Sequence, residues 1–135
     1  MHDEEDVALV KRGFEAAMGG DYDGLRTLPT DDVSFLGPFQ PEAHGADADA
    51  DADADVASMK QCDERARELG TRWEHEDEEF WADETRVVML HRMKLTRDGR
   101  TFDTHEVEIV ELRDGKACKL TEYTSEPEKL SEMMS

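Results

Sequence analysis

The sequence predicts an α+β fold in which three N-terminal helices cover one face of a bent antiparallel sheet. Apolar residues recur at three- and four-residue steps in the first half of the chain, whereas strand-like patterns dominate after Gly70. Two Asp-Gly pairs, at 98–99 and 114–115, are typical of the tight turns of β-hairpins. A chain of 135 residues is expected to form one domain, residues 1–135.

The first half contains three helical patterns and one short strand. Gly19-Gly20 ends the first helix, Asp21 is placed to cap the second, and Pro29 follows it. Gly70 ends the third helix. The predicted elements are helices over residues 6–18, 21–28 and 57–69, with a strand over 33–36.

An acidic insertion, residues 40–56, separates the short strand from the third helix. It contains five consecutive Ala-Asp pairs, residues 46–55. A period of two is wrong for an amphipathic helix, and a strand would stack five like charges on one face, so we expect a solvated loop. Alternating aspartates also resemble the start of an EF-hand calcium loop, but the glycine and glutamate that such a loop needs do not occur together in any register.

Four strands are predicted to form a meander, over residues 71–81, 86–96, 101–112 and 116–124, followed by a short acidic tail from Pro127. Two-residue turns fix the pairing of their strands. The first turn sets His91 opposite Glu106. The second sets Glu108 opposite Thr121, and Glu106 opposite Tyr123. A one-residue bulge would invert this assignment.

One face of this sheet is predicted to line a pocket beneath the helices. Its ionisable groups suit acid–base chemistry, because a carboxylate beside an imidazole fixes the tautomer of the ring and a tyrosine can donate to an oxyanion. The candidate catalytic residues are His91, Glu106, Glu108 and Tyr123. The candidate ligand-contacting residues are Met89, Met93, Thr121, Phe14, Phe35 and Trp73. The alternative is a solvated face with surface ion pairs. We expect His44 and His75 to be solvated, and the alternative for His44, which lies beside the insertion, is a lid over the pocket.

The opposite face carries a compact apolar patch with a charged rim. An apolar patch on a half-exposed sheet indicates a subunit interface, so we expect a homodimer. The residues of this predicted interface are Val88, Leu90, Val107, Ile109 and Leu120.

The composition restricts the partners. With 35 acidic against 16 basic residues and a net charge of −19, binding to nucleic acid or to an anionic membrane is disfavoured. No apolar run approaches a membrane span, and the acidic N-terminus is unlike a secretory signal, so a cytoplasmic location is expected. Cys62 and Cys118 form no zinc pattern, and we expect no metal or cofactor.

The charge also bears on the working environment. The basic residues are ten Arg and only six Lys. An acidic, lysine-poor surface is typical of a protein that works in multimolar salt, where self-repulsion is screened. The sequence therefore predicts a halophilic source, with an ordinary acidic protein as the alternative.

These residues resemble a known family. Residues 10–25 resemble the first helix and glycine-aspartate turn of the nuclear transport factor 2-like superfamily, and residues 31–35 its first strand. Residues 87–100 resemble its SnoaL-like branch, and residues 108–116 with Glu122-Tyr123 complete the pattern. The resemblance covers nearly the whole chain apart from the insertion. It implies a cone-shaped barrel with an internal cavity, usually in a homodimer.

Members of this superfamily include ketosteroid isomerases, polyketide cyclases, epoxide hydrolases, dehydratases and binding modules, so the fold alone does not assign a function. Gly13 and Gly37 stand at the tyrosine and base positions of the isomerases, and only Glu108 matches their second acid. The resemblance implies a small-molecule-binding domain. The alternative is a cofactor-free acid–base enzyme of the cyclase, isomerase or dehydratase type, acting on a small carbonyl compound.

Overall fold

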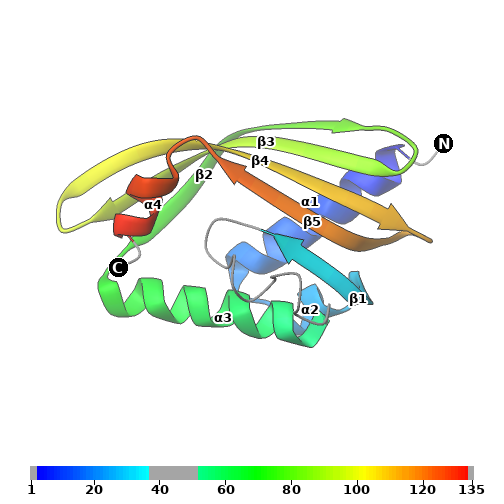
Figure 1. Ribbon diagram of the computed structural model, residues 1–135, viewed down its shortest axis with the longest axis horizontal. Coiled ribbons are helices and arrows are strands. Elements are labelled where there is room, and N and C mark those ends of the chain that lie inside the picture. The colour runs from blue at the N-terminus through cyan, green and yellow to red at the C-terminus, as the bar shows by residue number, and fades with distance from the viewer. Residues whose placement is uncertain (1–2, 37–51, 134–135) are drawn as a thin grey trace.

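The computed structural model describes residues 3–36 and 52–133. Helices precede the meander, as the sequence predicted, and a further helix follows it (Figure 1). The elements are α1 (Asp3–Gly19), α2 (Tyr22–Arg26), β1 (Pro29–Leu36), α3 (Ala52–Leu69), β2 (Arg72–Ala82), β3 (Arg86–Arg97), β4 (Arg100–Arg113), β5 (Lys116–Thr124) and α4 (Pro127–Met133).

The five strands form one sheet in the order β1-β5-β4-β3-β2. Strands β2 to β5 pair antiparallel, whereas β1 pairs with β5 in parallel. Both residues of each Asp-Gly turn have positive φ, 53° and 75° at Asp98-Gly99 and 52° and 75° at Asp114-Gly115. Positive φ at both central residues is what a type I′ hairpin turn requires, so both predicted hairpins are confirmed.

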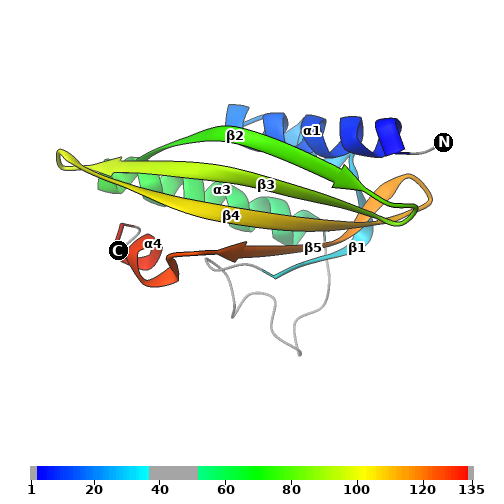
Figure 2. The ribbon, with the colours of Figure 1, turned by 90° about the horizontal axis from the view of Figure 1, so that it is seen from above.

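Helices α1 and α3 lie on one side of the sheet, here called the inner face (Figure 1). Seen from above, strands β3 and β4 pass in front of α3 (Figure 2). Two apolar clusters pack at opposite ends of the inner face. Val10 of α1 packs with Val87 and Val110 at one end, and Leu130 of α4 packs with Met93 and Leu95 at the other. The middle of the face is left for polar groups.

The pairing of β3 with β4 is confirmed over its whole length, with His91 opposite Glu106 and Met89 opposite Glu108. The predicted pairing of β4 with β5 is wrong beyond the turn. Leu112 pairs with Ala117 but Glu111 pairs with Lys119, so Cys118 is an extra residue in β5. This bulge shifts the remaining pairs by one residue.

The shift reverses which side chains of β5 face the helices. Glu108 pairs with Glu122, and Val107 pairs with Tyr123. Because the side chains of a strand alternate between faces, Glu122 turns to the inner face and Tyr123 to the outer one.

Helix α3 begins at Ala52, so the last five residues of the predicted insertion loop are helical. Ala52 is fully buried, and Asp53 accepts from the Nε of Arg26 at 2.7 Å. Arg26 also contacts Asp31 at 2.9 Å, which ties α2, β1 and α3 together. Residues 40–51 and His44 lie outside the described residues.

The tail after Pro127 forms helix α4 rather than an extended acidic segment. Leu130 is 1% exposed, with Trp73 and Phe102 packed against its cluster. The described part of the chain contains no helix that is long and apolar enough to span a membrane.

Candidate functional site

A cavity between the helices and the inner face has two adjoining compartments. The apolar compartment has a volume of about 110 Å³ and lies among α1, α2, β1, α3 and the sheet. The polar compartment has a volume of about 130 Å³ and lies over the middle of β2, β3 and β4. The residues that line both compartments are Phe14, Ala17, Phe35, Met59 and Glu108.

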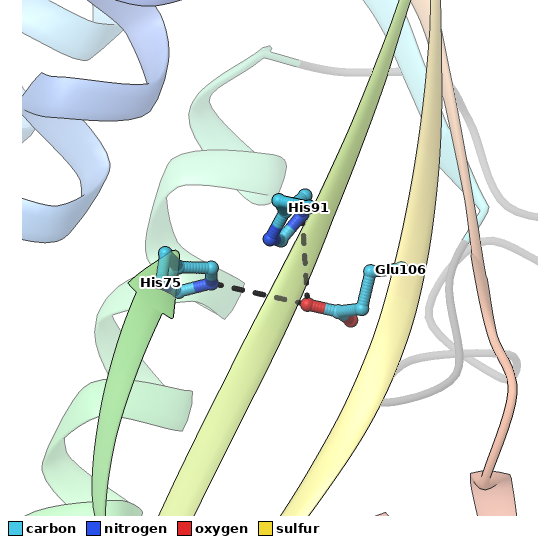
Figure 3. A group of neighbouring side chains, drawn as sticks. All are labelled: His75, His91 and Glu106. Carbon is cyan, nitrogen blue, oxygen red and sulfur yellow. Dashed lines mark ion pairs between the residues drawn. The ribbon is translucent and has the colours of Figure 1, made fainter. Parts of the chain in front are cut away.

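The polar compartment contains a histidine–glutamate cluster contributed by three neighbouring strands (Figure 3). His75 of β2 and His91 of β3 both direct Nε2 at Oε1 of Glu106 of β4, at 3.8 and 3.7 Å. His91 Nε2 also lies 3.6 Å from Oε2 of Glu108. These distances exceed that of a hydrogen bond, so the groups face one another without being bonded.

The cluster is deeply buried. The side chains of His75, His91 and Glu106 are 8%, 2% and 3% exposed. Neither ring nitrogen of His91 has a hydrogen-bond partner among the described residues, and the same holds for Oε2 of Glu106. Buried polar groups are nearly always bonded, so these atoms are candidate contacts for a bound ligand.

Phe14 of α1 fixes the two imidazole rings. Its ring meets His75 edge-on, with centroids 4.8 Å apart at 89°, and meets His91 at 5.4 Å and 62°. The two histidine rings lie 4.7 Å apart. The phenyl ring therefore closes the helix side of the cluster and restricts the rotation of both imidazoles.

Burial determines the protonation of the cluster. It lowers the pKa of His75 to about 4, with a smaller contribution from His91, so this ring is neutral at neutral pH. Burial likewise raises the pKa of Glu106. Burial, and then the charges of Glu108 and Glu106, raise the pKa of Glu122 well above its usual value.

Comparison with known proteins agrees with this architecture. The SnoaL-like domain family matches residues 10–120. The chain belongs to the SnoaL-like family. An uncharacterised protein of Mycobacterium tuberculosis is 26% identical over 129 residues, which cover 94% of each chain.

Solved structures share the fold of this SnoaL-like domain. An NTF2-like protein from Burkholderia xenovorans superimposes with a TM-score of 0.78 at 24% identity, covering 100% of this chain and 99% of that one. A candidate polyketide cyclase from Xanthomonas campestris gives 0.75 at 18% identity, covering 98% and 99%. TerC, co-crystallised with polyporic acid, gives 0.72 at 18%, covering 96% and 98%. The predicted nuclear transport factor 2-like fold is confirmed.

Most of the predicted site residues of this SnoaL-like domain lie around the cavity. Met89 lines the apolar compartment, and Phe14, Phe35 and Glu108 line both. The remaining predicted residues in the polar compartment are Trp73, His91, Met93 and Glu106.

Two predicted site residues lie elsewhere. Thr121 pairs with Ile109 and Tyr123 with Val107, which puts both on the outer face, and Tyr123 is 57% exposed. The cause is the bulge at Cys118. The same shift moves Leu120 from the predicted interface to the apolar compartment, which it lines.

His75 and Glu122 belong to the polar compartment but were missed by sequence reasoning. His75 was expected to be solvated, because acidic residues surround it. The alternation of strand side chains could have corrected this, since Trp73 and His75 lie two residues apart and share a face. Glu122 has no comparable signal, because its orientation depends on the bulge.

Proposed function

We propose that this SnoaL-like domain binds a small, largely apolar molecule that carries a carbonyl group. The supporting observation is the continuity of the two compartments, which meet at Phe14, Phe35 and Glu108. Apolar walls with a few convergent polar groups are typical of small-molecule sites. TerC, which shares the fold, was crystallised with the small molecule polyporic acid.

The orientation of the ligand follows from the two walls. Its apolar body packs against Val10, Leu28 and Met89 in the first compartment. Its carbonyl oxygen faces the polar compartment, where a protonated Glu122 is the donor. A carbonyl oxygen accepts a hydrogen bond from this carboxyl group without adding a negative charge to the cluster. A carboxylate ligand would be repelled by the other glutamates.

The two tryptophans offer a direct test. Trp73 lines the polar compartment, whereas Trp81 lies on the outer face and is 53% exposed. In the Trp81→Phe variant, aromatic ketones are expected to change the fluorescence of Trp73 saturably, and more tightly than matched hydrocarbons without the carbonyl. In the Trp73→Phe variant, the signal of Trp81 should stay constant.

A cavity-filling variant provides the control. Ala17 lines both compartments, so Ala17→Phe is expected to weaken ketone binding at least about tenfold, or about 1.4 kcal/mol. Arg12 is exposed on the same helix and lines neither compartment, so Arg12→Phe should bind as the parent does. Equal affinities in the two variants would exclude the cavity as the binding site.

A second candidate function is cofactor-free acid–base catalysis at the same place. Glu108 favours it, because its carboxylate lies at the junction of the compartments, 15% exposed and 3.6 Å from His91. There it would take a proton from the carbon beside a bound carbonyl. A bound ketone would then exchange its α-protons with D2O, and Glu108→Gln would abolish the exchange. Ketone binding without α-proton exchange would contradict catalysis and leave ligand binding as the only proposed function.

The outer face supports the proposal of a homodimer. Trp81, Val88 and Ile109 lie side by side across the sheet, and the same row continues to Thr121 and Leu36. Trp81 and Leu36, at the ends of this row, are 53% and 48% exposed. Light scattering is expected to give twice the chain mass. Ile109→Glu should yield a monomer, and a wild-type monomer would contradict the proposal.

We propose a halophilic, cytoplasmic setting from the charge of the chain alone. The curated relatives are mycobacterial and lend this proposal no support. The 35 acidic residues repel one another at low salt, and the Debye length falls from about 10 Å at 0.1 M to about 3 Å at 1 M. Thermal melts are therefore expected to show a midpoint that rises from about 0.1 M to about 3 M KCl. A flat or falling midpoint would remove the basis for a halophilic origin.

A further inference from the structure

The histidine–glutamate cluster has the composition of a transition-metal site. His75, His91 and Glu106 each offer one ligand atom, and these atoms lie within 4.8 Å of one another. Two imidazoles and one carboxylate form a common donor set for divalent first-row metals, including zinc and non-haem iron. Magnesium and calcium prefer oxygen ligands, so the donor set favours a transition ion.

The spacing of the ligand atoms is close to that of a metal site. A tetrahedral ion with bonds of about 2.0–2.1 Å holds neighbouring ligand atoms about 3.3 Å apart. Both Nε2 atoms lie 3.7–3.8 Å from Oε1 of Glu106. Each of these two pairs would have to close by about half an ångström. All three ligand atoms lie within 4.8 Å of one another, so the two histidine nitrogens would have to approach by at most about 1.5 Å.

The supporting strands make the arrangement rigid. The three residues come from the adjacent strands β2, β3 and β4, and His91 is paired directly with Glu106 (Figure 3). Phe14 packs against both imidazole rings. Ligands fixed in this way lose little conformational entropy on binding an ion.

Independent support comes from the missing hydrogen bonds. The side chain of His91 is only 2% exposed, and no described residue bonds either of its ring nitrogens. Glu106 is 3% exposed, with Oε2 similarly without a partner among the described residues. An ion bound by Nε2 of His91 would give this buried nitrogen a partner, and it would replace the repulsion among the carboxylates by attraction.

We infer that His75, His91 and Glu106 bind one divalent transition-metal ion, such as Zn²⁺, at the floor of the polar compartment. Glu108 lies 3.6 Å from His91 Nε2 and is the nearest further carboxylate. The cavity side leaves a coordination position for water or for the oxygen of a ligand. This inference goes beyond the proposed binding function and does not depend on it.

The test uses the full chain, stripped with a chelator and titrated with Zn²⁺ or Co²⁺ in the absence of any organic ligand. Calorimetry is expected to show one tight site per chain, and Co²⁺ is expected to give the visible absorption of a low-coordinate nitrogen and oxygen site. His75→Asn and His91→Asn should each weaken this site at least about tenfold. His105→Asn is the matched control, because His105 is exposed on the outer side of the same sheet.

Ring-nitrogen NMR of the wild-type chain provides a readout that does not depend on the folding of the variants. Zn²⁺ is expected to shift the resonances of His75 and His91, while those of His105 stay in place. Unchanged resonances of His75 and His91 at saturating Zn²⁺ would overturn the inference. Binding that is equal in all three variants would also overturn it and would assign the ion to the acidic surface. Ketone binding measured without metal distinguishes these failures from failure of the proposed function.

Discussion

Leu130→Ala is expected to lower the free energy of unfolding by about 2–5 kcal/mol, because Leu130 is 1% exposed in a cluster with Met93 and Leu95. The substitution removes buried methyl groups and leaves a cavity that the sheet cannot close. Urea unfolding, followed by circular dichroism, measures the loss. The helix itself is not weakened, since alanine has the highest helix propensity.

Lys129→Ala is the matched control, because Lys129 is exposed on the same helix α4. Its expected cost is under about 1 kcal/mol. A similarly small loss at Leu130 would mean that α4 does not dock on the sheet in solution. Docking matters for the site, because Leu130 shares its cluster with Met93 and Trp73, which line the polar compartment.

The fold and half of the site were predictable because their determinants are local. The Asp98-Gly99 turn fixes the pairing of β3 with β4. The alternation along β3 then puts Val87, Met89 and Leu95 on the inner face with His91 in the middle. The amino-acid sequence alone therefore sufficed to place His91 opposite Glu106.

The rest of the site depends on a β-bulge that has no clear signal in the local sequence. The bulge at Cys118 has neither glycine nor proline to mark it, and its Sγ donates to the carbonyl oxygen of Glu111 at 3.4 Å. The predicted turn at Asp114-Gly115 was correct, yet the register beyond it changed. The shifted register brings Glu122 into the pocket in place of Tyr123, so a carboxyl group takes the place expected for a phenol.

Position 75 illustrates a different difficulty. The run of acidic residues around His75 favoured a solvated strand, although its neighbours Glu74 and Glu76 point to the opposite face. A second bulge lies between Glu76 and Glu79, where Asp77 has a φ of 56°. This bulge shifts the alternation by one residue, so the side chains that face the helices are Trp73 and His75 before it and Phe80 and Ala82 after it. The acidic composition of the strand masked this pattern.

Glu122→Gln is expected to stabilise the protein by about 1–3 kcal/mol at pH 8 and by almost nothing at pH 4. The pKa of Glu122 is raised in the folded state, chiefly by burial. Between the unfolded and folded pKa values the folded state binds more protons, so stability falls as the pH rises. Glutamine has the same shape and stays neutral, so it avoids this loss. Urea unfolding between about pH 4 and pH 8 measures the difference.

Glu84→Gln is the control for net charge, because Glu84 is exposed in the turn between β2 and β3. Its effect should be small and nearly independent of pH. His75 has the opposite effect on the pH dependence. Its pKa is about 4 in the folded state, so the unfolded state binds more protons and stability falls as the pH drops below about 6.5. Wild type and variant both contain His75, so its contribution largely cancels in their difference.

A Glu122→Gln effect that is constant with pH would show that Glu122 does not hold a proton in the folded pocket. The proposed donor to a bound carbonyl would then be lost as well.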